Sequence, residues 1–237
     1  MGSQERIKEF KNLKEYNKEK GLSSLLILNN NEITHFNSNI ENKLVEESNK
    51  FWASYSYNNI KLCLPYIRND LNKKIEVFLN KTNLDIRINK YTCVIHYRIG
   101  DFIKLGNMIN IKSIVSACKL HNHNFKEIYI LNRGKNHNED DATEGDKLLN
   151  NLIEELKKEY NNCNIILLDN NADYDFIYLT KAPYLVIAGG SFAIWGTIGN
   201  MNGKILSPCC KNLNFPKIGK ISPELITNNW NTYDNDY

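Results

Sequence analysis

The residues best suited to chemistry lie in the short segment His96–Asp101, which reads His-Tyr-Arg-Ile-Gly-Asp. A guanidinium is a rigid fork that grips a phosphate through two hydrogen bonds, and it stays charged at physiological pH. Arg98 could therefore hold a diphosphate and stabilise the negative charge that grows on it as it departs. Gly100 allows a tight turn or a close approach of backbone to a ligand. His96 and Asp101 are candidates to orient Arg98 or to touch the ligand themselves.

The residue types alone leave a second interpretation of this segment open. Arg98 and Asp101 could form an ordinary surface ion pair beside a turn glycine, and such pairs contribute little.

A second candidate site is the glycine turn Gly189-Gly190-Ser191, which follows an apolar run and precedes a helical pattern. The first N–H groups of a helix have no partner within it and form a ready anion site. The turn would present these donors, and the Ser191 hydroxyl would add another. Glycines after a strand also serve simple chain reversal, so the turn alone does not choose between the two interpretations.

Both segments resemble motifs of a known enzyme family. The pattern His96-x-Arg98-x-Gly100-Asp101 resembles the His-x-Arg-Arg-Gly-Asp motif of the α-1,2-, α-1,6- and protein O-fucosyltransferases. In those enzymes the first arginine holds the β-phosphate of GDP-fucose. Arg98 stands at that position, and Ile99 stands at the position of the second arginine.

The second segment is similar to the same family in two ways. Residues 190–196, Gly-Ser-Phe-Ala-Ile-Trp-Gly, are similar to the Ser-Ser-Phe-Ser-Trp-Trp-Gly ending of the α-1,2 enzymes, with Gly190 at the first serine. The spacing from Asp175 to Ser191 resembles that of the α-1,6 enzymes, in which both residues contact the nucleotide sugar. The two motifs cover about 30 residues in the family's order.

The resemblance implies an inverting fucosyltransferase that moves fucose from GDP-fucose to a glycan hydroxyl, with a GT-B-like fold and no essential metal or cofactor. It implies a catalytic role for Arg98, and Asp101 is the nearest candidate for the base. The residues that it places against the nucleotide sugar are His96, Arg98, Gly100, Asp175, Gly190, Ser191 and Phe192.

Two other functions remain open at this stage. Three departures from the family pattern favour a glycosyltransferase that uses a different nucleotide sugar. They are Ile99, Gly190 and the turn that begins at Asn132, which is acidic in the related enzymes and basic here. The short first 90 residues favour a non-catalytic protein that binds a glycan or a partner on a transferase fold.

The elements that must position these residues alternate along the chain. Apolar runs predict strands at residues 91–96, 127–131, 164–168, 184–188 and 204–206, and helical patterns lie at 111–121, 146–160, 175–181 and 191–200. Such alternation predicts an α/β fold with a parallel, Rossmann-like sheet, because parallel strands need helical crossovers. Ligands of such sheets bind beyond the carboxyl ends of the strands. Both candidate segments follow strand ends.

The chain divides into two predicted regions. Residues 1–90 are expected to form a small, mainly helical N-terminal region, either the acceptor side or a reduced first domain, with one helix that starts near Pro65. Residues 91–237 form the domain that binds the nucleotide sugar. The chain's 237 residues suit either one large domain or two small ones.

Composition narrows the partners. The net charge is +3 and no long basic run occurs, so nucleic acid is not expected as a partner. No stretch of about 18 apolar residues occurs, so we expect no integral membrane segment. We therefore expect a cytoplasmic protein, or a lumenal Golgi or ER protein if an upstream anchor has been removed.

Several residues that often bind metals or sugars are interpreted as structural. The six cysteines form no CxxC pair and no histidine lies at zinc spacing, so we expect neither a metal site nor a disulfide framework. His121, His123 and His137 are expected to be exposed to solvent. Trp52 and Trp230 are expected in a core.

Overall fold

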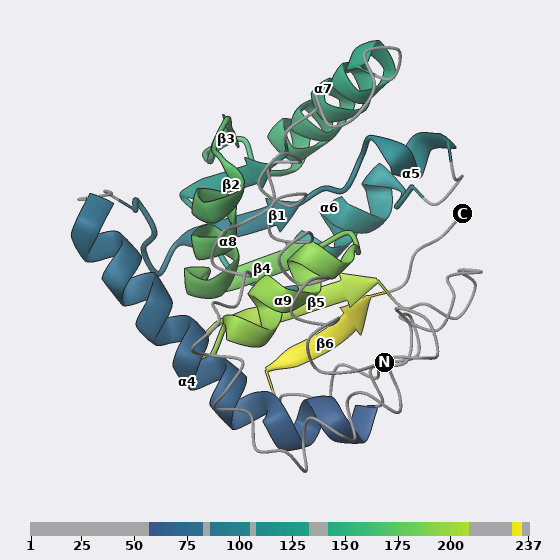
Figure 1. The fold of residues 1–237 in the computed structure, drawn as a ribbon. Helices are drawn as coiled ribbons and strands as arrows, with labels where there is room; N and C mark the ends of the chain where they lie inside the picture. Colours follow the sequence, from purple (N-terminus) through teal and green to yellow (C-terminus); the bar gives the residue numbers. More distant parts are fainter. Residues whose placement is uncertain (1–56, 83–85, 105–107, 133–141, 209–228, 234–237) are drawn as a thin grey trace.

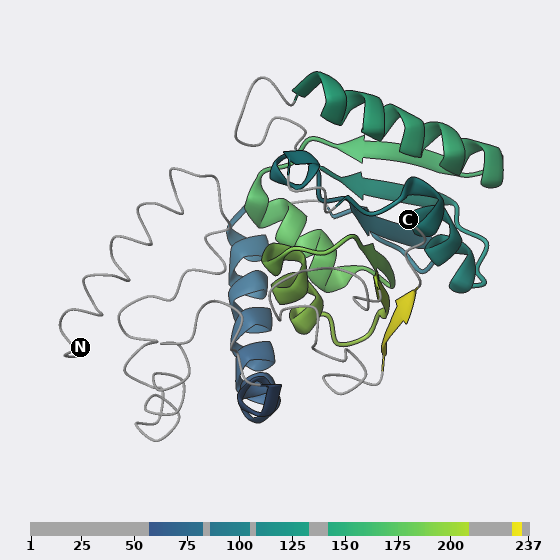
Figure 2. The ribbon, with the colours of Figure 1, turned by 90° about the vertical axis from the view of Figure 1, so that its right-hand side faces the viewer.

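The computed structural model describes residues 57–82, 86–104, 108–132, 142–208 and 229–233. Its centre is a parallel sheet, which Figure 1 shows running through the molecule. The strands are β1 (Thr92–His96), β2 (Glu127–Leu131), β3 (Asn164–Leu168), β4 (Tyr184–Ile187), β5 (Lys204–Pro208) and β6 (Trp230–Tyr233). Their order is β3-β2-β1-β4-β5-β6, and every neighbouring pair is parallel. Figure 2 shows β3 and β6 at opposite ends of the sheet.

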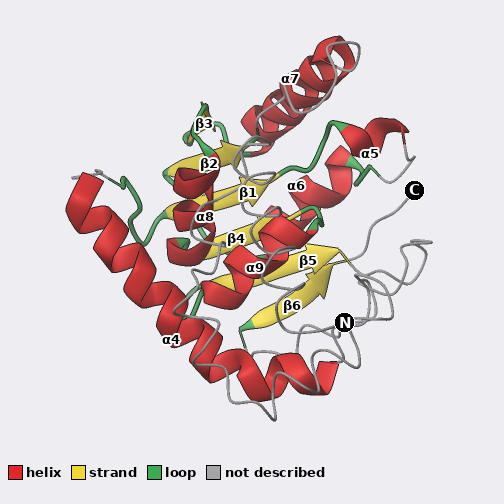
Figure 3. Ribbon diagram, in the orientation of Figure 1, coloured by secondary structure: helices red, strands yellow, loops and turns green. Residues whose placement is uncertain are grey.

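Helices cover both faces of this sheet, and Figure 3 shows their alternation with the strands. They are α4 (Tyr57–Thr82), α5 (Asp101–Lys104), α6 (Ile111–Leu120), α7 (Ala142–Glu159), α8 (Ala172–Lys181) and α9 (Ser191–Gly199). Helices α6 and α7 pack on one face, and α8 and α9 pack on the other. This arrangement confirms the predicted α/β fold with a parallel sheet.

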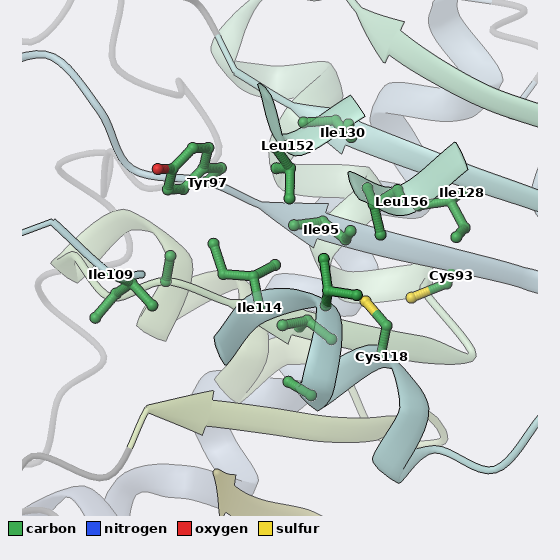
Figure 4. Close-up of a cluster of buried hydrophobic side chains, with 14 of the residues drawn as sticks. Cys93, Ile95, Tyr97, Ile109, Ile114, Cys118, Ile128, Ile130, Leu152 and Leu156 are labelled. Atoms are coloured by element: carbon green, nitrogen blue, oxygen red, sulfur yellow. The ribbon is translucent and has the colours of Figure 1, made fainter. Parts of the chain in front are cut away.

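The central strands β1, β2 and β4 are mostly apolar because both of their faces are buried. Ile95 on β1 and Ile130 on β2 point to one face, where Leu152 and Leu156 of α7 and Ile114 of α6 meet them (Figure 4). All five side chains are fully buried. Val94 and Tyr129, the alternate residues of β1 and β2, point to the other face and contact the α8–α9 layer.

Every strand and helix predicted between residues 91 and 206 occurs, and most of them have boundaries shifted by one to four residues. Helix α8 starts at Ala172 instead of residue 175, because the Asn171 side chain accepts a hydrogen bond from the Tyr174 N–H at 3.0 Å and caps the helix there. Helix α7 starts at Ala142 instead of residue 146. Strand β6 and the short helix α5 were not predicted.

Helix α4 overturns the expected start near Pro65, because it begins at Tyr57 and contains that proline. Its C-terminal half packs on the α8–α9 layer, where Leu71 and Ile75 join Phe176 and Ile177 in one buried cluster. This packing holds a helix that a proline weakens by removing a backbone donor. Most of the proposed N-terminal region lies outside the described residues, so the division at residue 90 stays a prediction.

No helix in the described part of the chain is both long and apolar enough to cross a membrane.

Candidate functional site

The two predicted segments lie side by side where the sheet changes its winding direction. From β1 the chain winds outward through β2 to β3, and α8 then returns it to β4 on the other side of β1. Ligands of doubly wound sheets bind at this switch point, beyond the strand ends. The carboxyl ends of β1 and β4 are joined directly, because the Ala188 N–H donates to the His96 carbonyl at 2.9 Å.

Residues 96–99 alternate between the two faces as a strand does. His96 and Arg98 lie toward α9, since the His96 ring is 6.0 Å from the Phe192 ring and Arg98 approaches Gly190. Tyr97 and Ile99 instead enter the core beneath α6 and α7, where both are buried. Ile99, which stands where the fucosyltransferase motif has its second arginine, is therefore a core residue in this chain.

Arg98 lies near an aromatic ring and a glycine backbone. Its guanidinium carbon is 5.0 Å from the centre of the Phe102 ring, a cation–π contact. Arg98 also lies close to the backbone of Gly190, since a Cβ added there would be 3.6 Å from Arg98 Cδ and 3.8 Å from Nη1. The charge is thus placed at the turn that begins α9.

Gly100, Gly189 and Gly190, the glycines of the two turns, have backbone conformations that other residues rarely adopt. Gly100 has φ of 63°, and Gly189 and Gly190 both have φ of 92°. A Cβ at these angles is strained. The glycines therefore serve the turn geometry itself, and that geometry brings the backbone of Gly190 against Arg98.

The first turn of α9 offers backbone donors to a ligand. Gly190 is the N-cap residue and provides no side-chain cap, and the first N–H bonded back to it is that of Ile194, at 3.1 Å from the Gly190 carbonyl. The N–H groups of residues 191–193 therefore have no acceptor within the helix. Together with Arg98, this helix end can bind an anion through both charge and directed hydrogen bonds.

His96 is a neutral imidazole at this site. Burial, and to a smaller extent the nearby charge of Arg98, lower its pKa from the ordinary value of 6.5 to about 4. Its Nδ1 atom is buried and has no hydrogen-bond partner within the described residues. A ring with so low a pKa contributes no positive charge at neutral pH, so the anion-binding charge comes from Arg98.

Asp175 lies on α8 and Phe192 lies on α9, the two helices of the layer that His96 and Arg98 face. Asp175 is a buried residue of α8, next to Phe176 in sequence. The Phe176 ring meets the Phe192 ring edge to face at 5.7 Å, and the Phe192 ring contacts His96. A line of aromatic rings therefore connects α8 to the end of β1.

Of the predicted site residues, the structure brings together His96, Arg98, Gly190 and Phe192. Asp101 begins α5 and Ser191 begins α9, but their side chains fall outside those that the structure describes.

Two residues of the site were not predicted from the sequence. Phe102 of α5 contacts Arg98, which precedes that helix, so no helical spacing could have indicated the pair. Asn132 follows β2, and its Nδ2 donates to the Tyr97 carbonyl at 2.9 Å. This hydrogen bond links the segment after β2 to the segment after β1.

The expectation that His121 and His123 are exposed was wrong. His121 is buried, with its ring edge-on to Tyr184 at 5.3 Å, and His123 stacks on the same tyrosine at 4.4 Å. They form an aromatic cluster with Phe125 before the start of β2, away from Arg98. Packing against Tyr184 of β4, which sequence position cannot show, buries His121 and partly buries His123. His137 and Trp52 lie outside the described residues, as does the side chain of Trp230.

Within the described ranges, no three His, Cys, Asp or Glu side chains gather closely enough to hold a metal ion. No protein-family model matches this chain, and no curated protein or solved structure matches it either.

Proposed function

We propose that this protein is an inverting glycosyltransferase that moves fucose from GDP-fucose to a glycan hydroxyl. The observation that carries the proposal is the packing of Arg98 against Gly190 at the start of α9, at the switch point of the sheet. A cation and a helix N-terminus that converge there suit the diphosphate of a nucleotide sugar. The sugar and the GT-B-like fold are inferred from the resemblance of the two motifs to fucosyltransferases.

The proposed reaction is a direct displacement at the anomeric carbon. The acceptor oxygen forms a bond to that carbon while the bond to the β-phosphate oxygen of GDP breaks, and the configuration inverts. Arg98 and the first N–H groups of α9 stabilise the negative charge that grows on the departing diphosphate. Asp101 is the candidate base that takes the proton of the acceptor hydroxyl.

His96 serves this reaction as a neutral group. With a pKa of about 4, only about one ring in a thousand is protonated at neutral pH. It is also a weak base, so it is a poor candidate to take the acceptor proton. Its buried imidazole suits a hydrogen bond that holds the ligand or the turn in place.

The test measures GDP binding by calorimetry in variants of Arg98. Arg98→Ala removes the charge and the fork, and loss of charge-assisted hydrogen bonds of about 1.5–3 kcal/mol weakens binding roughly 10- to 150-fold. Arg98→Lys keeps the charge without the fork, so its affinity for GDP should lie between those of the wild type and Arg98→Ala. Arg87→Ala, at an exposed arginine before β1, is the matched control and should bind as the wild type does. Wild-type affinity in Arg98→Ala would refute the phosphate role.

The donor is tested separately, because Ile99 enters the core and leaves the motif with a single arginine. A thermal-shift panel of GDP-, UDP- and dTDP-sugars, each at several concentrations, ranks the donors. The largest stabilisation by GDP-fucose, followed by transfer or hydrolysis of that donor, supports the proposal. A larger effect of another nucleotide sugar supports the first alternative. Binding of GDP without turnover across a wide acceptor panel supports a non-catalytic protein.

A further inference from the structure

Strand β3 forms one edge of the sheet, and it lacks the features that usually protect such an edge. Its sequence, Asn-Ile-Ile-Leu-Leu, contains no charged residue and no proline. Leu167 is 43% exposed, and the neighbouring Ile165, Ile166 and Leu168 are only partly buried. Natural edge strands are normally blunted by charges, prolines or bulges, because their open backbone groups pair with other strands.

The hydrogen bonds show which backbone groups are open. The Asn164 N–H donates to the Lys126 carbonyl at 2.9 Å, so the backbone groups of Asn164 point toward β2. Because successive residues of a strand point their groups to opposite sides, Ile166 and Leu168 also bond toward β2. Ile165 and Leu167 therefore direct their N–H and C=O groups away from the sheet. Among the described residues, no strand pairs with that side of β3.

We propose that β3 pairs edge to edge, antiparallel, with β3 of a second copy of this chain. A two-fold axis at Ile166 sets Ile165 of each copy opposite Leu167 of the other. Both residues have outward-pointing groups, so each of the two pairs exchanges two hydrogen bonds. The sheets of the two copies then continue into one another across the axis.

The side chains fit the same register. Ile165 and Leu167 lie on the face that α7 covers, since Ile165 packs against that cluster. In the antiparallel pair, exposed Leu167 of one copy packs beside Ile165 of the other. No like charges meet across the axis, because the five residues are uncharged. A single edge that satisfies itself in this way fits the isologous contact of a two-fold dimer.

The dimer would leave the candidate site open. β3 and β1 are separated by β2, so the paired edge is about 10 Å from the strand that leads to Arg98. Changes at the edge should therefore alter association without altering GDP binding.

The test is sedimentation equilibrium of the full chain over roughly a hundredfold range of concentration, with wild type and variants compared. Leu167→Lys places two like charges diagonally across the two-fold axis, and Leu167→Pro removes an outward donor without touching the bonds to β2. Each should weaken dimerisation at least about tenfold. Leu120→Lys, at a 63% exposed leucine of α6, is the matched control and should dimerise as the wild type does. Circular dichroism checks the fold of each variant.

Hydrogen exchange of the Ile165 and Leu167 amides provides a second readout, since protection should rise with concentration as the dimer forms. A wild type that stays monomeric over the whole range overturns the proposal. So does a dimer that both Leu167 variants leave intact. Protection of the two amides in a monomer also overturns it, because another part of the chain would then cover the edge.

Discussion

Acidification should destabilise this fold through two buried histidines, His96 and His121. Burial is the main cause that lowers the pKa of each from 6.5 to about 4, and part of that shift comes from neighbouring positive charge: Arg98 for His96, and Lys204 for His121. The unfolded chain therefore binds more protons than the native state between these two pH values. The free energy of unfolding is at its full value above pH 6.5, falls as the pH drops through this window, and levels off below pH 4.

The size of the effect follows from the two pKa values. Within the window, each pH unit costs up to about 1.4 kcal/mol for each histidine. Between pH 7 and pH 5 the loss is about 2 kcal/mol for each, after allowance for partial protonation near pH 6.5. His96 lies at the carboxyl end of β1 and His121 lies near the amino end of β4, so the two rings are far apart and their contributions should add.

Urea denaturation at several pH values measures this loss. Carboxylates also titrate as the pH falls, so the comparison is between the wild type and the variants His96→Gln and His121→Gln. Each variant should lose about 2 kcal/mol less than the wild type between pH 7 and pH 5, and the double variant about 4 kcal/mol less. A wild-type pH dependence in His96→Gln would refute the view that its imidazole is buried in the neutral form.

Three substitutions test the packing that builds the site. Gly190→Ala should cost about 1–3 kcal/mol of stability, because φ is 92° there, and should weaken GDP binding by moving the start of α9 away from Arg98; urea denaturation and calorimetry measure both. Gly196→Ala should also destabilise, by about 1–3 kcal/mol, because the new Cβ would lie 2.5 Å from Leu179 Cβ between α8 and α9; an unchanged denaturation midpoint would contradict this packing. Asn200→Ala should cost about 3 kcal/mol or more in the same assay, since its buried amide bonds the Leu179 and Ala182 carbonyls and the Gly203 N–H.

The sequence predicted the candidate site where backbone chemistry is local. Glycine is the residue type that tolerates positive φ angles, and Gly100, Gly189 and Gly190 have such angles. Arg98 follows a mostly apolar strand. The positions of both turns could therefore be predicted from neighbouring residues alone. Strand β6 was not found in this way, because Trp-Asn-Thr-Tyr is only four residues long and is held by pairing with β5, more than 20 residues earlier in the chain. Helix α5, only four residues long, gave no periodic signal.

By itself, the sequence determined that this chain folds around parallel strands and that an arginine and a glycine turn each follow a strand end. The spacing of apolar and polar residues along the chain determines where strands and helices form. Only the tertiary structure decided that the two segments meet, since strand order places β4 beside β1 although about 90 residues separate them. It also decided that Ile99 and His121 are buried, because burial depends on helices and strands that pack from elsewhere in the chain.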